Sequence, residues 1–126
     1  MSTRSVFSFH EAGIKRKFHV YKHTDGYPAG AVRAFLNALP FAFDLPRFEA
    51  DEFAAAFIAG NKKDSGGVRY SNGPQHHPDL EYHYELWQGT DKTLMINGWR
   101  LGDKKTRFYF GPLEQFVNIY KSKQAA

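Results

Sequence analysis

The sequence predicts a single α+β domain in which helices cover one face of a mostly antiparallel sheet of about five strands. Three observations support this fold class. The expected elements run in the order ββααβββα, which lacks the strand–helix alternation of parallel sheets. The chain has 126 residues, the size of one domain. Phe, Tyr and Trp make up 17% of it, far too many rings for a disordered chain.

The N-terminal part predicts a β-hairpin and then a helix. Residues 6–9 and 18–21 are rich in β-forming side chains and are separated by a stretch that contains glycine. The turn His-Thr-Asp-Gly-Tyr-Pro at residues 23–28 places Pro28 at the start of a helix. Apolar residues then recur at helical spacing until Pro40 ends the helix.

A second helix and a long loop are expected next. The helix follows Asp44 and Pro46, carries Phe48, Phe53 and Phe57, and ends at residues 60–61, Gly-Asn. Residues 61–79 contain several Gly and Pro residues and predict a long loop, which in a compact domain is usually functional or disordered. Each helix has one apolar face, so both must cover something.

The C-terminal part predicts three strands and a last helix. The strands span residues 80–87, 93–101 and 106–110 and are joined by turns that begin at Gly89 and Gly102. The last helix opens at residues 111–112, Gly-Pro, and has an apolar face.

Alternation of side chains along the strands divides the residues between two faces of the sheet. The apolar face, expected under the helices, has Phe18, Val20, Leu80, Tyr82, Tyr84, Leu86, Leu94, Ile96, Phe108 and Phe110. The opposite face has His19, Tyr21, His23, Glu81, His83, Glu85, Trp87, Met95, Asn97, Trp99, Lys105, Arg107 and Tyr109. Exposed surfaces that mix rings with polar groups mark interaction sites. We therefore expect this face to be a homo-oligomer interface, a ligand site, or both.

Charge and cysteine content exclude several classes of function. The net charge is +4, and the densest basic run, residues 15–17, has the character of a solvated surface. There is no Cys, so disulfides and thiolate chemistry are excluded. No apolar run approaches the ~18 residues that span a bilayer, and residues 1–5 lack the apolar region of a signal peptide. The sequence predicts a cytoplasmic protein with no membrane partner.

Two segments are candidate ligand sites. In residues 64–73, glycines let backbone N–H groups converge on an anion, Arg69 offers a planar fork for phosphate, and Tyr70 offers a stacking surface. In the turn at residues 23–28, Tyr27 lies where a helix N-terminus can meet an anion. A surface loop and ordinary turn chemistry are the simpler interpretations of the two segments.

Catalytic and metal-binding patterns are few. The one metal-like set is Asp79, Glu81, His83 and Glu85 on one strand face, preceded by His76 and His77. A single strand supplies two ligands at most, so a solvated face is the simpler interpretation. No Gly-x-Ser-x-Gly, Walker or His-Glu-x-x-His pattern is present. We therefore expect no catalysis and no cofactor, with a metal-dependent hydrolase using His76, His77, Glu81 and His83 as an alternative.

Three segments resemble small, mostly uncharacterised phage and prophage proteins. They are residues 18–30, with the pattern His-x-Asp-Gly-Tyr-Pro-x-Gly, residues 79–85, Asp-Leu-Glu-Tyr-His-Tyr-Glu, and residues 110–116, Phe-Gly-Pro-Leu-Glu-Gln-Phe. Together they touch about a quarter of the chain, and Thr24 stands where the group usually has an aromatic residue.

In size and layout, the chain is also similar to phage sponge proteins that counter the Thoeris defence by sequestering cyclic nucleotide signals. That similarity implies a homo-oligomer that holds a nucleotide through Arg contacts and ring stacking and performs no chemistry.

These observations predict a phage-type binding protein in the cytoplasm of an infected or lysogenic bacterial host. It would sequester a small phosphate-bearing, cyclic-nucleotide-like signal molecule to counter host defence. Arginines would pair with phosphates, rings would frame a base and an amide would read a polar edge. The residues expected in these roles are Arg69, Arg100 and Arg107; Tyr27, Tyr70 and Trp99; and Asn97. Expected partners are further copies of the chain and this ligand, not nucleic acid. The alternative is an interaction module that docks its open sheet face on a host protein.

Overall fold

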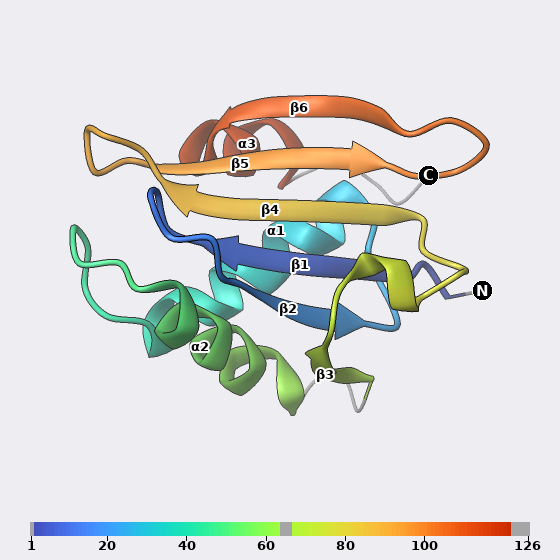
Figure 1. The fold of residues 1–126 in the computed structure, drawn as a ribbon, viewed down its shortest axis with the longest axis horizontal. Coiled ribbons are helices and arrows are strands. Elements are labelled where there is room, and N and C mark those ends of the chain that lie inside the picture. Colours follow the sequence, from blue (N-terminus) through green and yellow to red (C-terminus); the bar gives the residue numbers. More distant parts are fainter. Residues whose placement is uncertain (1, 64–66, 122–126) are drawn as a thin grey trace.

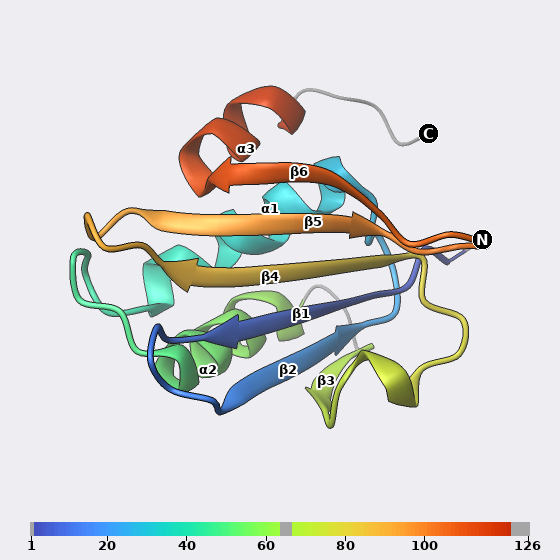
Figure 2. The same cartoon turned by 45° about the horizontal axis from the view of Figure 1, so that its top comes forward.

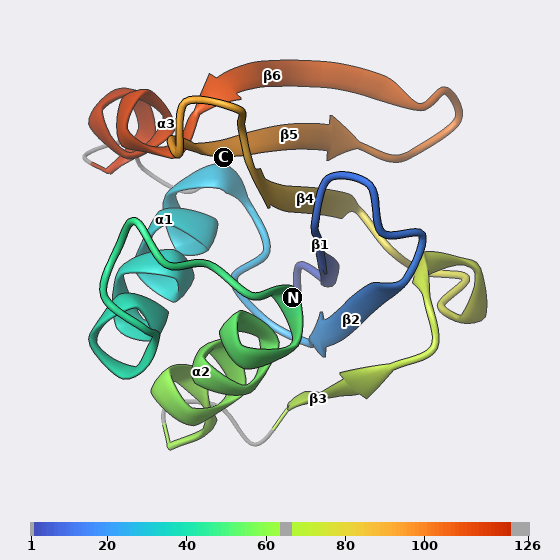
Figure 3. The ribbon, with the colours of Figure 1, turned by 60° about the vertical axis from the view of Figure 1, so that its left-hand side comes forward.

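The computed structural model describes residues 2–63 and 67–121 and has two layers (Figure 1). One layer is a six-stranded sheet, and the other is formed by helices on one of its faces (Figure 3). The strands are β1 (Ser5–His10), β2 (Lys17–Lys22), β3 (Val68–Ser71), β4 (Tyr82–Gln88), β5 (Leu94–Arg100) and β6 (Thr106–Pro112). The helices are α1 (Pro28–Ala38), α2 (Ala50–Lys62) and α3 (Leu113–Tyr120), with short 3₁₀ turns η1 (Leu39–Phe41) and η2 (Pro74–His76). The predicted α+β class is confirmed.

The strands lie in the order β3-β2-β1-β4-β5-β6, which Figure 2 shows side by side. Neighbouring strands are antiparallel except β1 and β4, which are parallel. β3 joins the outer edge of β2, so the chain must pass to the far side of β1 before β4 begins. The segment that contains η2 makes this passage on the face opposite the helices (Figure 3). There, His77 stacks on the ring of Tyr21 at a centroid distance of 4.3 Å.

The prediction of a long loop at residues 61–79 was wrong. This stretch contains the end of α2, the strand β3 and the turn η2. β3 has only four residues, and two of them, Arg69 and Tyr70, are exposed. Its backbone pairs with β2, from His19 opposite Ser71 to Lys22 opposite Val68. A short edge strand with one inward apolar residue shows too little alternation of apolar and polar side chains to be recognised from the sequence, particularly among glycines.

Aromatic rings fill the space between the two layers. Phe7 of β1 contacts Phe35 of α1, Phe57 of α2 and Tyr84 of β4 at centroid distances of 5.4, 4.6 and 5.0 Å. All four side chains are fully buried. The Tyr84 hydroxyl donates to the carbonyl of Gly26 at 2.7 Å, and burial raises the pKa of this tyrosine well above its ordinary value.

The turn at residues 23–28 has a structural role. Asp25 has a φ of 57°, which reverses the chain between β2 and α1. A Cβ atom at Gly30 would lie 1.9 Å from the carbonyl oxygen of Asp25, so only glycine lets the helix start this close to the turn. Gly30 of the resembling segment is thus explained by close packing.

A β-bulge in β6 reverses part of the predicted alternation. Gly98 pairs with Tyr109 but Trp99 pairs with Arg107, so Phe108 is an extra residue in β6. Tyr109 therefore packs on Phe116 of α3 at 5.3 Å, while Phe110 lies on the open face at 6.1 Å from Trp87. The face assignments of Tyr109 and Phe110 were wrong for this reason, while Phe108 lies on the helical side as predicted.

None of the described helices has the length and apolar character needed to cross a bilayer.

Candidate functional site

The open face of the sheet, opposite the helices, carries two rows of side chains that run across all six strands. α1 and α3 lie behind the strands in Figure 1, so this face is turned toward the viewer. From β3 to β6, the serine row is Ser71, His19, Ser8, Glu85, Asn97 and Phe110. The arginine row is Arg69, Tyr21, Val6, His83, Trp99 and Arg107.

Ser8 links two histidines at the centre of the open face. Its Oγ lies 2.6 Å from Nδ1 of His19 and 2.8 Å from Nε2 of His83. A hydroxyl has one proton, so it donates to one imidazole and accepts an N–H from the other when both rings are neutral. Burial lowers the pKa of both histidines, that of His83 to about 4. Ser8 itself is 1% exposed, so its hydroxyl is inaccessible to a substrate in this arrangement.

Glu85 organises the neighbouring part of the face. Its Oε1 accepts hydrogen bonds from Nε1 of Trp99 at 2.8 Å and from Nδ2 of Asn97 at 3.2 Å. Its Oε2 lies 3.6 Å from Nζ of Lys17. Burial alone would raise the pKa of Glu85, but the Trp99 hydrogen bond and the electrostatic interactions with His83 and Lys17 lower it below its ordinary value. The ionised carboxylate therefore fixes Trp99 and Asn97.

Two cations lie on the Trp99 ring. Nζ of Lys105 is 4.4 Å from the ring centroid, and Cζ of Arg107 is 5.7 Å from it. Arg107 also lies 5.1 Å from the Phe110 ring, and its Nη1 donates to Oδ1 of Asn97 at 3.4 Å. Within the described residues, neither cation forms an ion pair. Their remaining N–H groups are available to an anion.

Nearly parallel rings continue the surface toward β1. Trp87 lies 6.1 Å from Phe110 and 5.3 Å from His10, at interplanar angles of 24° and 21°. Phe110 is 55% exposed, which is unusual for a phenyl ring. We name the group Glu85, Trp87, Asn97, Trp99, Lys105, Arg107 and Phe110 the open-face cluster.

The predicted site residues fall into three groups. Asn97, Trp99 and Arg107 come together in the open-face cluster. Arg69 lies in the same row as Arg107 but at its other end, five strand spacings or roughly 24 Å away. The others lie elsewhere: Tyr70 is on the helical side of β3, Arg100 packs over Tyr82, and Tyr27 is at the start of α1.

The contacts of Tyr27 are local. Its hydroxyl accepts a hydrogen bond from Arg33 at 3.1 Å and donates to Asp25 at 3.3 Å. The structure therefore separates this tyrosine from the ring-rich face that it was expected to join.

Four members of the open-face cluster were not among the predicted site residues: Glu85, Trp87, Lys105 and Phe110. Alternation had placed Glu85, Trp87 and Lys105 on the correct face, but no spacing rule shows that they meet. The sequence could not place Phe110 on the open face, because no sequence pattern marks the bulge at Phe108. The one local signal is Gly98, a glycine inside the neighbouring strand β5, where the register shifts.

The residues of the metal-site alternative do not converge. His83 is buried against Ser8, whereas His77 binds Ser71 through Nε2 at 2.7 Å and stacks on Tyr21. In residues 2–63 and 67–121, no group of three or more His, Asp or Glu side chains is placed to hold a metal ion.

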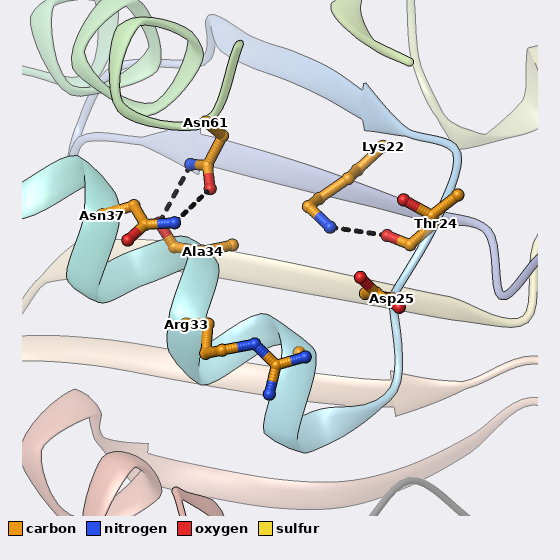
Figure 4. Close-up of a pocket in the computed structure, with 8 residues that line it drawn as sticks. Lys22, Thr24, Asp25, Arg33, Ala34, Asn37 and Asn61 are labelled. Carbon is orange, nitrogen blue, oxygen red and sulfur yellow. Dashed lines mark hydrogen bonds between the residues drawn. The ribbon is translucent and has the colours of Figure 1, made fainter. Parts of the chain in front are cut away.

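A polar pocket of about 230 Å³ lies on the other side of the molecule, between the end of β2 and α1 (Figure 4). Asn37 donates to Oδ1 of Asn61 at 3.2 Å, and Asn61 donates to the carbonyls of Ala34 and Phe57. Lys22 donates to the Thr24 carbonyl at 2.6 Å. These bonds connect α1 to α2 and close the turn after β2, so the lining groups have structural roles.

Comparison with known protein families, curated proteins and solved structures finds no match for this chain. The interpretation of the open-face cluster therefore depends on its own geometry and chemistry.

Proposed function

We propose that the chain is a non-catalytic binding protein whose open-face cluster holds a small ligand with a planar ring and a phosphate, such as a cyclic nucleotide. The observation that carries this proposal is the pair of cations, Lys105 and Arg107, held on the Trp99 ring without a carboxylate partner in the described chain. An anion bound there would receive charge-assisted hydrogen bonds.

The cluster is organised before a ligand arrives. Glu85 fixes the indole of Trp99 and the amide of Asn97, and these two in turn support Arg107. Less side-chain freedom is then lost when a phosphate binds, which favours affinity. The exposed ring of Phe110 beside Trp87 offers a stacking surface for a base, worth about 1 to 3 kcal/mol.

Sequestration of a signal molecule needs binding without turnover. The two serines of this face whose hydroxyls contact imidazoles in the described chain, Ser8 and Ser71, are both buried. A role in countering host defence, in the cytoplasm of a bacterial host, remains part of the proposal and rests on the sequence resemblance.

Self-association also belongs to the proposal. The helical side has an apolar groove of about 380 Å³ lined by Leu36, Leu39, Leu45, Leu113 and Val117, among other residues. The resemblance implies a homo-oligomer, and we propose that a second copy of the chain covers this groove. Size-exclusion chromatography with light scattering should give the mass of an oligomer that a Leu36→Glu variant loses. A monomeric wild-type protein would contradict this part of the proposal.

Calorimetry with cyclic dinucleotides, cyclic ADP-ribose derivatives and AMP tests the ligand class. We expect at least one to bind and Arg107→Gln to weaken it about tenfold or more. Arg16→Gln is the matched control, because Arg16 also lies on a ring, that of Phe18, but outside the cluster. A short single-stranded oligonucleotide also carries bases and phosphates, so its binding is measured in a separate experiment. Binding to none of these compounds, or binding unchanged by Arg107→Gln, would overturn the proposal.

A further inference from the structure

A second hollow lies at the opposite end of the arginine row, where the η2 segment crosses the sheet. Its volume is about 260 Å³, and it is lined by Arg4, Tyr21, His23, Arg69, His77, Pro78 and Asp79. We name it the Arg69 hollow. Roughly 24 Å of sheet separates Arg69 from Arg107, so one mononucleotide cannot contact both.

Tyr21 lies at the centre of this hollow and has a cationic side chain on its ring, as Trp99 has in the open-face cluster. The Tyr21 ring is 7% exposed and stacks on the imidazole of His77 at 4.3 Å. Cζ of Arg69 lies 5.5 Å from the centroid of the same ring. The guanidinium is therefore held beside a buried ring, with cation–π attraction restricting its orientation.

The charge balance of the hollow favours an anion. Arg69 forms no ion pair within residues 2–63 and 67–121. Arg4 pairs with Oδ2 of Asp79 at 3.2 Å, but the Asp79 side chain is 73% exposed. Exposed pairs of this kind contribute little, so a stronger anion can replace Asp79 as the partner of Arg4.

Two imidazoles add hydrogen-bonding groups to the hollow. His23 uses Nδ1 with the Tyr21 hydroxyl at 2.8 Å, and His77 uses Nε2 with Ser71 at 2.7 Å. The other nitrogen of each ring makes no hydrogen bond within the described chain. The pKa of His77 is lowered by burial and by the nearby charges of His76 and Arg69. A bound anion would oppose the effect of those charges.

We propose that the Arg69 hollow is an independent site for a phosphate group, either inorganic phosphate or the terminal phosphate of an ester. Two guanidinium groups and two imidazoles supply more donors than the two oxygens of a carboxylate can use, whereas phosphate has three or four acceptor oxygens. This site is distinct from the ring-stacking site of the proposed function and does not depend on it.

Inorganic phosphate, glycerol phosphate and acetate are the probes. NMR of the imidazole protons should show saturable shifts of His77 and His23 with phosphate at an affinity of about 1 mM or tighter, and the pKa of His77 should rise by about half a unit or more. Glycerol phosphate distinguishes an ester site from one that takes only the free ion. Acetate should have no saturable effect.

Arg69→Gln should weaken phosphate binding about tenfold, and Arg69→Lys should restore part of it. Arg16→Gln, which removes a guanidinium outside both the hollow and the open-face cluster, should leave it unchanged. Because Arg69 is exposed at an edge strand, these variants are expected to fold. No saturable shift in wild-type protein, equal shifts in Arg69→Gln, or equal affinity for acetate would overturn this proposal. The ligand of the open-face cluster is measured separately, so either proposal can fail alone.

Discussion

Single residues of this protein are constrained mainly by whether their polar atoms find partners once they are buried. His83 and Ser5 illustrate the two outcomes. His83 is buried on the open face and hydrogen-bonded to Ser8. Burial lowers its pKa, so the imidazole remains neutral. Ser5 is buried with an Oγ that has no hydrogen-bond partner in the described chain. Each predicts a measurable change in stability.

The lowered pKa of His83 predicts that the folded state loses stability as the pH falls. The pKa is about 4 in the folded protein and 6.5 in the unfolded chain, so between these values the unfolded chain binds the proton more readily. From pH 7 to pH 5, this single group should lower the free energy of unfolding by about 2 kcal/mol. Urea denaturation at the two pH values measures the loss.

A His83→Gln variant isolates this contribution, because an amide can still bond to Ser8 but does not titrate in this range. His10, His19 and His77 also have lowered pKa values and stay in both proteins. The variant should therefore lose about 2 kcal/mol less than the wild type between pH 7 and pH 5. Equal losses would show that His83 binds its proton equally well in the folded and unfolded chains.

Ser5→Ala should stabilise the protein. Removing a buried hydroxyl that lacks a partner removes its desolvation cost, and the free energy of unfolding should rise by about 1 kcal/mol. Ser71→Ala is the matched control. Ser71 is also buried, but its Oγ contacts His77 and accepts from the Gly73 amide, so this variant should be destabilised by a similar amount. Destabilisation by Ser5→Ala would mean that its hydroxyl has a partner in solution.

At the scale of elements, sequence periodicity predicts the hairpin, three helices and three C-terminal strands, because each has enough residues to show its period. It fails for β3 and for the end of β6. β3 is short and is defined by pairing with β2, which lies far from it in the chain. In β6, the extra residue Phe108 exchanges the faces of Tyr109 and Phe110, which no local pattern reveals.

The packing of α2 on α1 depends on a glycine. A Cβ atom at Gly60 would lie 2.1 Å from the backbone oxygen of Asn37, and backbone cannot move aside as a side chain can. Gly60→Ala should therefore destabilise the protein by about 2 kcal/mol or more, although alanine improves helix propensity by about 1 kcal/mol. The loss of stability is measured as a fall in melting temperature, with Gly102→Ala as the control.

A Cβ atom at Gly102 has nothing within 4 Å, so the control should change stability by less than about 0.5 kcal/mol. If Gly60→Ala were neutral as well, the two helices would have to be farther apart in solution than the contact with Asn37 implies.

At the scale of the whole molecule, the sequence predicts which residues share the open face but not how they are grouped on it. Asn97, Trp99 and Arg107 meet because neighbouring strands align them, as parity suggests. Arg69 shares their face yet lies at the far edge, because β3 adds beyond β2. The position of an edge strand depends on long-range pairing, which single-sequence patterns do not contain. The arginines expected at a single phosphate site therefore lie at opposite ends of the sheet, and we propose a separate site for each.

This separation predicts how the two arginine sites combine. Sites roughly 24 Å apart that share no partners should be energetically independent. The loss of binding free energy for a small nucleotide at the open-face cluster should therefore be the same, within about 0.5 kcal/mol, in two proteins. These are the Arg107→Gln variant and the Arg69→Gln, Arg107→Gln double variant. Calorimetry of the four proteins, with and without saturating phosphate, measures this additivity.

An oligonucleotide of about eight nucleotides is the informative contrast, since at ~3.4 Å per nucleotide along a strand it is long enough to reach both ends of the arginine row. If it occupied both sites, each single variant would weaken its binding, whereas Arg69→Gln would leave the binding of a cyclic mononucleotide, which has no terminal phosphate, unchanged. Sensitivity of the mononucleotide to Arg69→Gln would contradict the independence of the two sites. It would require the sheet to bring Arg69 and Arg107 closer than the strand order β3-β2-β1-β4-β5-β6 allows.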